Sequence, residues 1–359
     1  MMRIFQNPFL GPLVRRFGGP QDIVETGISS WSSRLTLSAV ESGVFTGLAN
    51  GPLRERELAE AVGWHPRAAG TALDALVAAR LLRRDRAGRY ANTIRSATFL
   101  NRSKPSHVGG LMELSSKRLY DVWSKLDELV RTGQPGAEEE RGDNEFFSTI
   151  YRDPLALEEF LARMTRISTG EATLLAVRFP WKRFRTFVDI GCAQGALSVR
   201  VALTHRHLRG TGFDLPSVRP IFTEYVESFG LEDRLDFVEG DFLDAPLPRT
   251  DVVSFGHVFP GENQRTRQEL IARAYDATPP GGAVIVYDAM IQPGGRDNFQ
   301  SLPSGLDIMP ESREGYESST GACAELLRAG GFTKVKVRRL IGSTSAVFGY
   351  KPGRLPPAD

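Results

Sequence analysis

The sequence predicts a two-part fold: a mainly helical N-terminal half, and an α/β half built on a mostly parallel, doubly wound sheet. Two patterns carry this prediction. From Ser30 to about Leu126, apolar residues recur three and four positions apart, which is the period of a helix. From Phe184 onward, short apolar runs alternate with helical patterns, which is typical of a parallel sheet flanked by helices. A chain of 359 residues is long enough to give each part its own core.

Within the helical half, the stretch 55–93 is expected to form two short helices and then two strands that turn at Ala87-Gly88. This order is typical of a winged helix, whose second helix would need base-reading and phosphate-pairing side chains to bind DNA. The charged residues of that helix are few: Arg67, Asp74 and Arg80. We therefore expect a packing or dimerisation role, and four wing arginines keep DNA contact open as an alternative: Arg83, Arg84, Arg86 and Arg89.

The second half follows a loop rich in Gly, Pro and charge at 131–144 and an amphipathic helical stretch at 146–179. Its strands are expected at 186–191, 209–215, 235–242, 250–258, 283–291, 334–341 and 345–351. Only Gly342, Ser343 and Thr344 separate the last two, which predicts a hairpin that adds an antiparallel edge. The expected domains are a helical, winged-helix-like part at 1–130, a linker with connecting helices at 131–180, and the α/β domain at 181–352.

Composition excludes several classes of protein. With 45 basic and 43 acidic residues the net charge is +2, so bulk charge favours neither a nucleic acid nor an anionic membrane as partner. Cys192 and Cys323 are the only cysteines, too few for a disulfide framework or a thiolate metal site, and a reducing cytoplasm fits best. No run of 18 apolar residues predicts a membrane span, and the first residues do not resemble a secretion signal.

A nucleotide-like site is predicted where the first strand of the second half turns into a helix. Asp189, Gly191 and Gly195 lie in "FVDIGCAQGALS", where glycines let a ligand approach the backbone and a helix N-terminus offers free N–H groups. Asp214 ends the next strand and is placed to accept hydrogen bonds from ribose hydroxyls. Further along, Asp241 is placed to accept from an adenine amine while Phe242 packs on the ring.

The competing ligand is a dinucleotide, whose G-x-G-x-x-G fingerprint needs a middle glycine near the pyrophosphate. Ala193 occupies that position. The wider G-x-x-x-G spacing, preceded by an acid, suits a ligand with an amino-acid tail and no phosphates, which indicates S-adenosylmethionine. The plainer alternative is that both glycines only form a tight turn and that Asp241 only caps a helix.

These motifs resemble the S-adenosylmethionine-dependent O-methyltransferases of the plant caffeate/acetylserotonin type, whose bacterial members methylate natural-product intermediates. The resemblance extends through "LEDRLDFVEGDFLDAPLPRTDVV", "AYDATPPGGAVIVYDAMI" and "GYESSTGACAELLRAGGFTKVKV". It implies a Rossmann-like methyltransferase domain behind a dimerisation domain, and therefore a homodimer. It assigns the cofactor to Gly191, Asp214, Leu215, Asp241 and Phe242, with weaker matches at Met164 and Ser168. The glycine-rich loop is poorer in glycine here than in the family.

The base that the family uses is expected to be missing. The family pattern after the fourth strand is a His, two apolar residues, a second His that deprotonates the acceptor, and Asp-Trp. Aligned without a gap, the first His is His257 and the base position is Pro260, which cannot transfer a proton. His257 is then expected mainly to pack at the strand end. Substitute bases are expected among Asp288 and Glu317, which match acids that flank the base, and Glu262.

The resemblance places five residues near the acceptor: Phe146, Phe160, His257, Asp307 and Met309. We expect methyl transfer to a small aromatic or enolic intermediate, to oxygen by default and to carbon as an alternative, driven by positioning. Two rivals stay open. One is a family member that binds the cofactor but catalyses a different reaction, and the other is a winged-helix regulator that senses the cofactor.

Overall fold

The computed structural model describes residues 20–104, 107–109, 112, 124, 126–132, 150–292 and 319–354. The chain folds as two compact units, Met1–Tyr120 and Asp121–Asp359, and each is described by itself.

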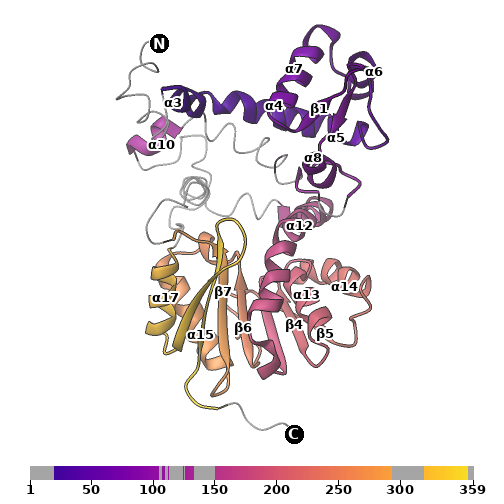
Figure 1. Cartoon of the computed structure of the whole chain (residues 1–359). Helices are drawn as coiled ribbons and strands as arrows, with labels where there is room; N and C mark the ends of the chain where they lie inside the picture. Colours follow the sequence, from indigo (N-terminus) through magenta and orange to yellow (C-terminus); the bar gives the residue numbers. More distant parts are fainter. Residues whose placement is uncertain are drawn as a thin grey trace. The chain divides into compact units, whose positions relative to one another are not determined.

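In the first unit, short helices and one hairpin surround a small core (Figure 1). The elements are α3 Pro20–Gly27, α4 Ser29–Glu41, α5 Val44–Gly47, α6 Glu55–Val62, α7 Pro66–Ala78, β1 Leu82–Arg84, β2 Tyr90–Asn92 and α8 Ile94–Phe99. The strands β1 and β2 pair antiparallel. Their turn forms because Gly88 takes a φ of 76° and the Asp85 carboxylate accepts the N–H groups of Ala87 and Arg89.

In the described part of the second unit, seven strands form one sheet in the order β5-β4-β3-β6-β7-β9-β8. The strands are β3 Thr186–Ile190, β4 Arg209–Asp214, β5 Leu235–Glu239, β6 Val252–Gly256, β7 Ala283–Ala289, β8 Thr333–Arg339 and β9 Thr344–Tyr350. The first five run parallel, and β9 pairs antiparallel with both β7 and β8. The predicted fold class and the C-terminal hairpin are therefore confirmed.

Helices cover both faces of this sheet, and the side chains of the strands alternate between two cores. Phe187 and Ile285 enter the core shared with α12 Pro154–Arg178, α13 Ala196–Thr204 and α14 Arg219–Glu227. Val188 and Val286 enter the opposite core, shared with α15 Gln264–Ala277 and α17 Thr320–Ala329. Central strands buried on both faces explain the continuous apolar runs. The edge strand β8 is exposed and rich in Lys and Arg, which opposes pairing with another chain.

Three side chains fix where the long helices begin near the carboxyl edge. Asp153 accepts the N–H groups of Leu155 and Ala156 at the start of α12. Asn263 and Ser319 cap α15 and α17 in the same way. One further short helix of this unit, α10 Leu126–Thr132, completes the described elements, together with the 3-10 turns η1 Trp181–Arg183, η2 Pro216–Val218 and η3 Phe259–Gly261.

Candidate functional site

The loop between β3 and α13 has the backbone that a ligand cradle needs. Gly191, Ala193 and Gly195 take φ values of 66°, 50° and 92°. A Cβ at Gly191 would lie 3.0 Å from Val258, and a Cβ at Gly195 would lie 2.7 Å from the Phe222 ring. Both glycines are therefore required by conformation and by space. Ala193 holds the same left-handed conformation with a side chain, so the loop is strained where a dinucleotide site would carry its middle glycine.

Asp214 ends β4 and ties this loop down. Its Oδ2 accepts the Ala193 N–H at 2.9 Å and its Oδ1 accepts the Leu215 N–H at 2.8 Å. Burial raises the pKa of Asp214 to about 6, against these two backbone hydrogen bonds, which lower it. Each carboxylate oxygen keeps a lone pair for a ligand. Asp214 thus shapes the cradle in addition to the ribose contact that the sequence predicts.

Asp189, in contrast, faces inward. Its two oxygens accept hydrogen bonds from the hydroxyls of Ser254, at 3.0 Å, and Ser198, at 3.3 Å. Burial raises the pKa of Asp189 to about 7, the two hydroxyls lower it, and the charge of Asp214 raises it further. The side chain joins β3 to β6 and α13, and it supports the loop from below.

Asp241, Phe242 and Glu262 lie close to one another. Asp241 Oδ1 accepts the Leu243 N–H at 2.8 Å and so closes a turn; no helix begins there, so the helix cap of the plainer alternative is not formed. Phe242 is half-buried, and its ring lies 4.0 Å from the Cβ position of Gly191. Burial raises the pKa of Glu262, the charge of Arg267 opposes this, and the negative charge of Asp241 adds to it. Glu262 therefore belongs to the neighbourhood of Asp241.

The helix α12 contributes Phe160, Met164 and Ser168, all half-buried. Phe160 packs in an apolar cluster with Leu157 and Ala193, which brings α12 to the loop after β3. Met164 and Ser168 lie one and two turns further along the same helix. Their contact with a cofactor stays a prediction.

Tyr151 is a residue of this neighbourhood that the sequence did not single out. It packs in the same cluster as Phe160 and Ala193. Burial raises the pKa of its phenol, and the negative charges of Asp214 and Cys192 add to the shift. The phenol therefore stays protonated and is a hydrogen-bond donor beside the cradle. Tyr151 lies within the amphipathic stretch 146–179, where an aromatic residue is expected in the core, so no sequence pattern distinguished it from a core aromatic.

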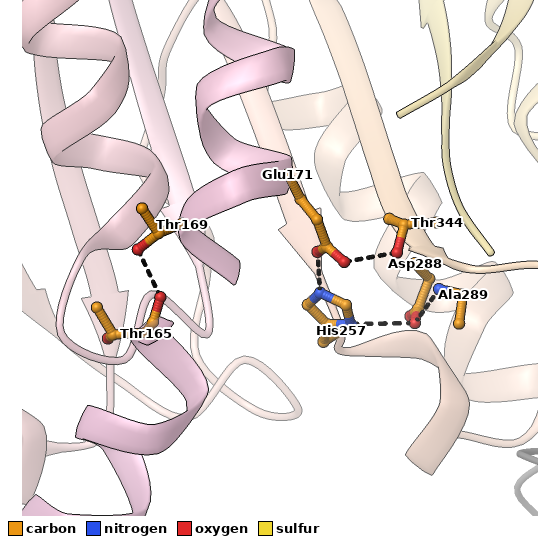
Figure 2. Close-up of polar contacts among 7 residues, drawn as sticks. All are labelled: Thr165, Thr169, Glu171, His257, Asp288, Ala289 and Thr344. Carbon is orange, nitrogen blue, oxygen red and sulfur yellow. Dashed lines mark hydrogen bonds and ion pairs between the residues drawn. The ribbon is translucent and has the colours of Figure 1, made fainter. Parts of the chain in front are cut away.

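At the carboxyl ends of β6 and β7, an imidazole lies between two carboxylates (Figure 2). His257 Nε2 lies 2.7 Å from Glu171 Oε2, and Nδ1 lies 3.2 Å from Asp288 Oδ1. Glu171, which α12 carries, also accepts the Thr344 hydroxyl at 2.5 Å. Asp288 Oδ1 accepts the Ala289 N–H at 2.8 Å. We call Glu171, His257 and Asp288 the acid–imidazole–acid network.

This network corrects the expectation that His257 mainly packs. Burial by itself lowers the pKa of His257, but the charges and hydrogen bonds of Asp288 and Glu171 outweigh it and hold the pKa well above its usual 6.5. The ring is thus an imidazolium that donates from both nitrogens. Its φ of 57° is unusual for a residue other than glycine, and the two carboxylates hold the side chain in that geometry.

Glu171 was missed because its partners lie far away in the sequence. The only signal is an acid inside the apolar stretch "GEATLLAV" of a helix whose neighbours Ala172 and Leu175 are buried. A buried carboxylate needs a hydrogen-bond or ion-pair partner. The sequence pattern therefore indicates that Glu171 has a partner, but it does not identify which residue that is.

Pro260 lies in the short turn η3, three residues beyond His257. It offers no titratable group at the position that the family pattern assigns to a base. Four predicted site residues lie outside the described residues, so their placement stays a prediction: Phe146, Asp307, Met309 and Glu317.

The described residues lack two kinds of feature. No group of three or more His, Cys, Asp or Glu side chains in that part of the chain is arranged to hold a metal ion. No helix there is long and apolar enough to cross a bilayer.

The chain is similar to known proteins over most of its length. Residues 123–333 match the model of the O-methyltransferase domain, and residues 28–102 match that of the O-methyltransferase dimerisation domain. The tetracenomycin polyketide synthesis 8-O-methyl transferase TcmO of Streptomyces glaucescens is 40% identical over 334 residues, covering 93% of this chain and 97% of TcmO. The N,N-dimethyltransferase OxyT of Streptomyces rimosus is 38% identical over 287 residues, covering 78% and 83%. A crystal structure of human N-acetylserotonin methyltransferase in complex with S-adenosylmethionine superposes with a TM-score of 0.82 at 25% identity, covering 92% and 97%.

Proposed function

The chain belongs to the O-methyltransferase family and is an S-adenosylmethionine-dependent methyltransferase, and we propose that its acceptor is a hydroxyl of a small aromatic or enolic natural-product intermediate. The observation that carries the proposal is the cradle of Gly191, Ala193 and Gly195 held by Asp214. Beside it, at the carboxyl ends of β6 and β7, the described residues include charged side chains but no imidazole free of carboxylate partners. TcmO, which is named as an 8-O-methyl transferase of tetracenomycin polyketide synthesis, supports the acceptor class.

The residues of the cradle fit the cofactor. Gly191 and Gly195 let the left-handed loop pack closely against Val258 and Phe222, and a buried carboxylate stands at the end of the next strand. Phe242 and Asp241 flank the same loop on its other side. Asp214 and Leu215 would hold the ribose, and Asp241 and Phe242 the adenine.

When bound, the cofactor supplies an electrophilic methyl group on a positively charged sulfur. Attack by the acceptor oxygen forms the O–CH₃ bond, and the electron pair of the S–CH₃ bond goes to sulfur. The chain must then hold the acceptor in line, keep out water, and leave the oxygen unprotonated.

No imidazole base serves this step among the described residues. Pro260 has no titratable group, and both nitrogens of His257 already donate to carboxylates. Loss of a general base costs a factor of about 10²–10⁴, whereas alignment of the reactants can supply more than that. We therefore propose that positioning drives the transfer, and that acceptors whose hydroxyl ionises readily react best. The same alignment of the reactants would let a carbon next to an enol act as the nucleophile. C-methylation is therefore the second outcome to test.

We also propose that the protein is a homodimer assembled through its first unit. Matching of residues 28–102 to a dimerisation domain supports this, as do apolar side chains exposed on α3, on α4 and between them: Ile23, Val24, Ile28 and Trp31. A DNA-binding role is not favoured. Arg84 pairs with Asp74 at 3.3 Å and Arg89 pairs with Asp85 at 2.8 Å, so these wing arginines bind within the chain.

The test is incubation with methyl-labelled S-adenosylmethionine and a panel of phenols, naphthols and enols, followed by mass spectrometry of the products. We expect label on oxygen of at least one aromatic acceptor. Cofactor binding without label in any product would favour a family member with a different reaction.

A further inference from the structure

The acid–imidazole–acid network leaves one buried oxygen without a donor. Asp288 Oδ1 accepts from both the Ala289 N–H and the His257 ring, whereas Oδ2 has no hydrogen-bond partner among the described residues. The residue is only 4% exposed. A buried carboxylate oxygen without a donor is unfavourable, and such an oxygen in a native protein is usually served by a bound molecule.

Asp288 is held so that this oxygen has a fixed direction. Two donors lock Oδ1, and one of them, His257, is itself locked by Glu171 of α12 at 2.7 Å. Glu171 is in turn held by the hydroxyl of Thr344, the first residue of β9. Figure 2 shows the two carboxylates on opposite sides of the imidazole. The free oxygen is thus positioned by four segments of the fold.

Asp288 Oδ2 lies at the carboxyl edge of the sheet, which is the edge at which parallel sheets bind ligands. Asp288 is the last residue but one of β7, and His257 directly follows β6. The carboxyl ends of these neighbouring strands face the same crevice. Val258, beside His257, lies 3.0 Å from the Cβ position of Gly191, so the network is next to the cofactor loop.

The charge of the network decides which group can bind there. Two carboxylates against one imidazolium leave a net charge of −1, and Oδ2 can only accept a hydrogen bond. A phenolate, which has no proton to donate and is negatively charged, is repelled from this position. This position therefore suits a neutral O–H or N–H donor and does not suit an ionised oxygen.

From this geometry we propose that Asp288 selects acceptors that carry a second hydrogen-bond donor besides the reacting group, as a polyhydroxylated aromatic does, and that His257 and Glu171 are its positioning residues. This inference rests on the proposed function, because it describes the acceptor of that same reaction. An acceptor lacking the second donor leaves Oδ2 unpaired and reacts about ten- to a hundredfold less efficiently.

The direct test compares dihydroxynaphthalenes with the matching naphthols as acceptors of the wild type and of Asp288→Asn. The amide is isosteric, but it can present a donor where Oδ2 presents an acceptor. We expect the wild type to prefer the dihydroxy acceptors by about tenfold or more in kcat/KM, mainly through KM, and the variant to lose that preference. The affinity for S-adenosylhomocysteine, measured by calorimetry, should change less than about threefold, which is the scatter expected of a residue outside the cofactor contacts.

Asp251→Asn is the matched control, because Asp251 precedes β6 at the opposite edge of the sheet and accepts the N–H groups of Arg185 and Thr186. It should keep the preference for dihydroxy acceptors. An unchanged preference in Asp288→Asn would overturn the inference while leaving the methyltransferase intact. Methylation of neither acceptor by the wild type would overturn the proposed function, and the inference with it.

The positioning role has its own readout. His257→Gly tolerates the φ of 57° and removes the ring, so added imidazole should restore part of the acceptor preference. In ¹⁵N-histidine NMR spectra of the wild type, one ring should keep both protons above the pH at which exposed histidines lose one, and Glu171→Gln should lower that pH. Loss of the preference that imidazole does not restore, or a ring that titrates normally, would contradict the positioning role.

Discussion

Two aspartates at the carboxyl edge of the sheet, Asp214 and Asp288, shape the candidate site. Asp214 and Asp288 both end parallel strands, but they have different surroundings: Asp214 accepts only backbone N–H groups, whereas Asp288 shares an imidazolium with Glu171. The first arrangement shapes a cradle and the second fixes a charged network. The sequence identified Asp214 from its place at the end of a strand and Asp288 from the family resemblance. It identified neither acid's partners, because a hydrogen bond that joins residue 171 to residue 257 has no local signature.

Tyr151→Phe is expected to weaken binding of S-adenosylhomocysteine. The substitution keeps the ring in its apolar cluster and removes the protonated hydroxyl beside Asp214. Loss of one hydrogen bond of about 0.5–1.5 kcal/mol corresponds to a roughly two- to twelvefold weaker affinity, which calorimetry resolves. Tyr225→Phe, on α14, is the control and should bind as the wild type does. Equal affinities in Tyr151→Phe and the wild type would remove Tyr151 from the site.

Asp189→Asn is expected to flatten the dependence of stability on pH. The pKa of Asp189 is raised from 3.8 to about 7 in the folded protein, so the folded state binds the proton more tightly than the unfolded state. Its contribution to stability is therefore fully present below pH 4 and lost as pH rises towards 7, by at most about 4 kcal/mol. Denaturant unfolding from pH 4.5 to 8 measures this. A slope as steep in the variant as in the wild type would show that Asp189 is ionised in the fold.

Among the structural elements, the loop from β3 to α13 depends most on particular residues. Its glycines were predicted from spacing, and the structure adds the reason: a Cβ at Gly195 would lie 2.7 Å from the Phe222 ring. The strands, their parallel order and the C-terminal hairpin were predictable because burial on both faces leaves continuous apolar runs. The role of Asp241 was not, since closing a turn and contacting an adenine require the same residue type.

Gly195→Ala should lose both stability and cofactor affinity, because the new Cβ meets Phe222 and must adopt a φ of 92°. Gly230→Ala is the matched control: its φ is 63°, but no atom lies within 4 Å of the new Cβ. The control should lose about 1–2 kcal/mol from the left-handed backbone alone. In denaturant unfolding, Gly195→Ala should lose more unfolding free energy than the control. In calorimetry, it should also bind S-adenosylhomocysteine more weakly. Equal losses of unfolding free energy in the two variants would show that the loop accommodates the new Cβ without a steric penalty.

For the protein as a whole, exposed apolar residues on the first unit indicate where the proposed dimer assembles. Trp31 is 72% exposed and Ile23 is 76% exposed on neighbouring helices of the first unit, which matches a dimerisation domain. Scattered apolar residues are normal on a surface, but a group of them on two successive short helices indicates an interface.

Light scattering should therefore give twice the chain mass of 39.6 kDa at micromolar concentration. Trp31→Glu should shift the protein towards monomer, because a buried aromatic contributes about 2–3 kcal/mol to association, which is a factor of about 30 or more. The substitution Arg56→Glu, on the exposed face of α6, is the control and should leave the mass unchanged. A monomeric wild type would contradict the proposed assembly.

The most direct test of positioning without an imidazole base is the pH dependence of kcat for a series of phenolic acceptors of different acidity. Because Pro260 cannot titrate and His257 donates from both nitrogens, the rising limb of each profile should follow the pKa of the acceptor and move with it. Glu262→Gln, Asp288→Asn and Glu317→Gln should each lower kcat by less than about 10². A rising limb that stays at one pH for every acceptor, and that one of these substitutions abolishes while the affinity for S-adenosylhomocysteine is unchanged, would identify a substitute base and contradict the account.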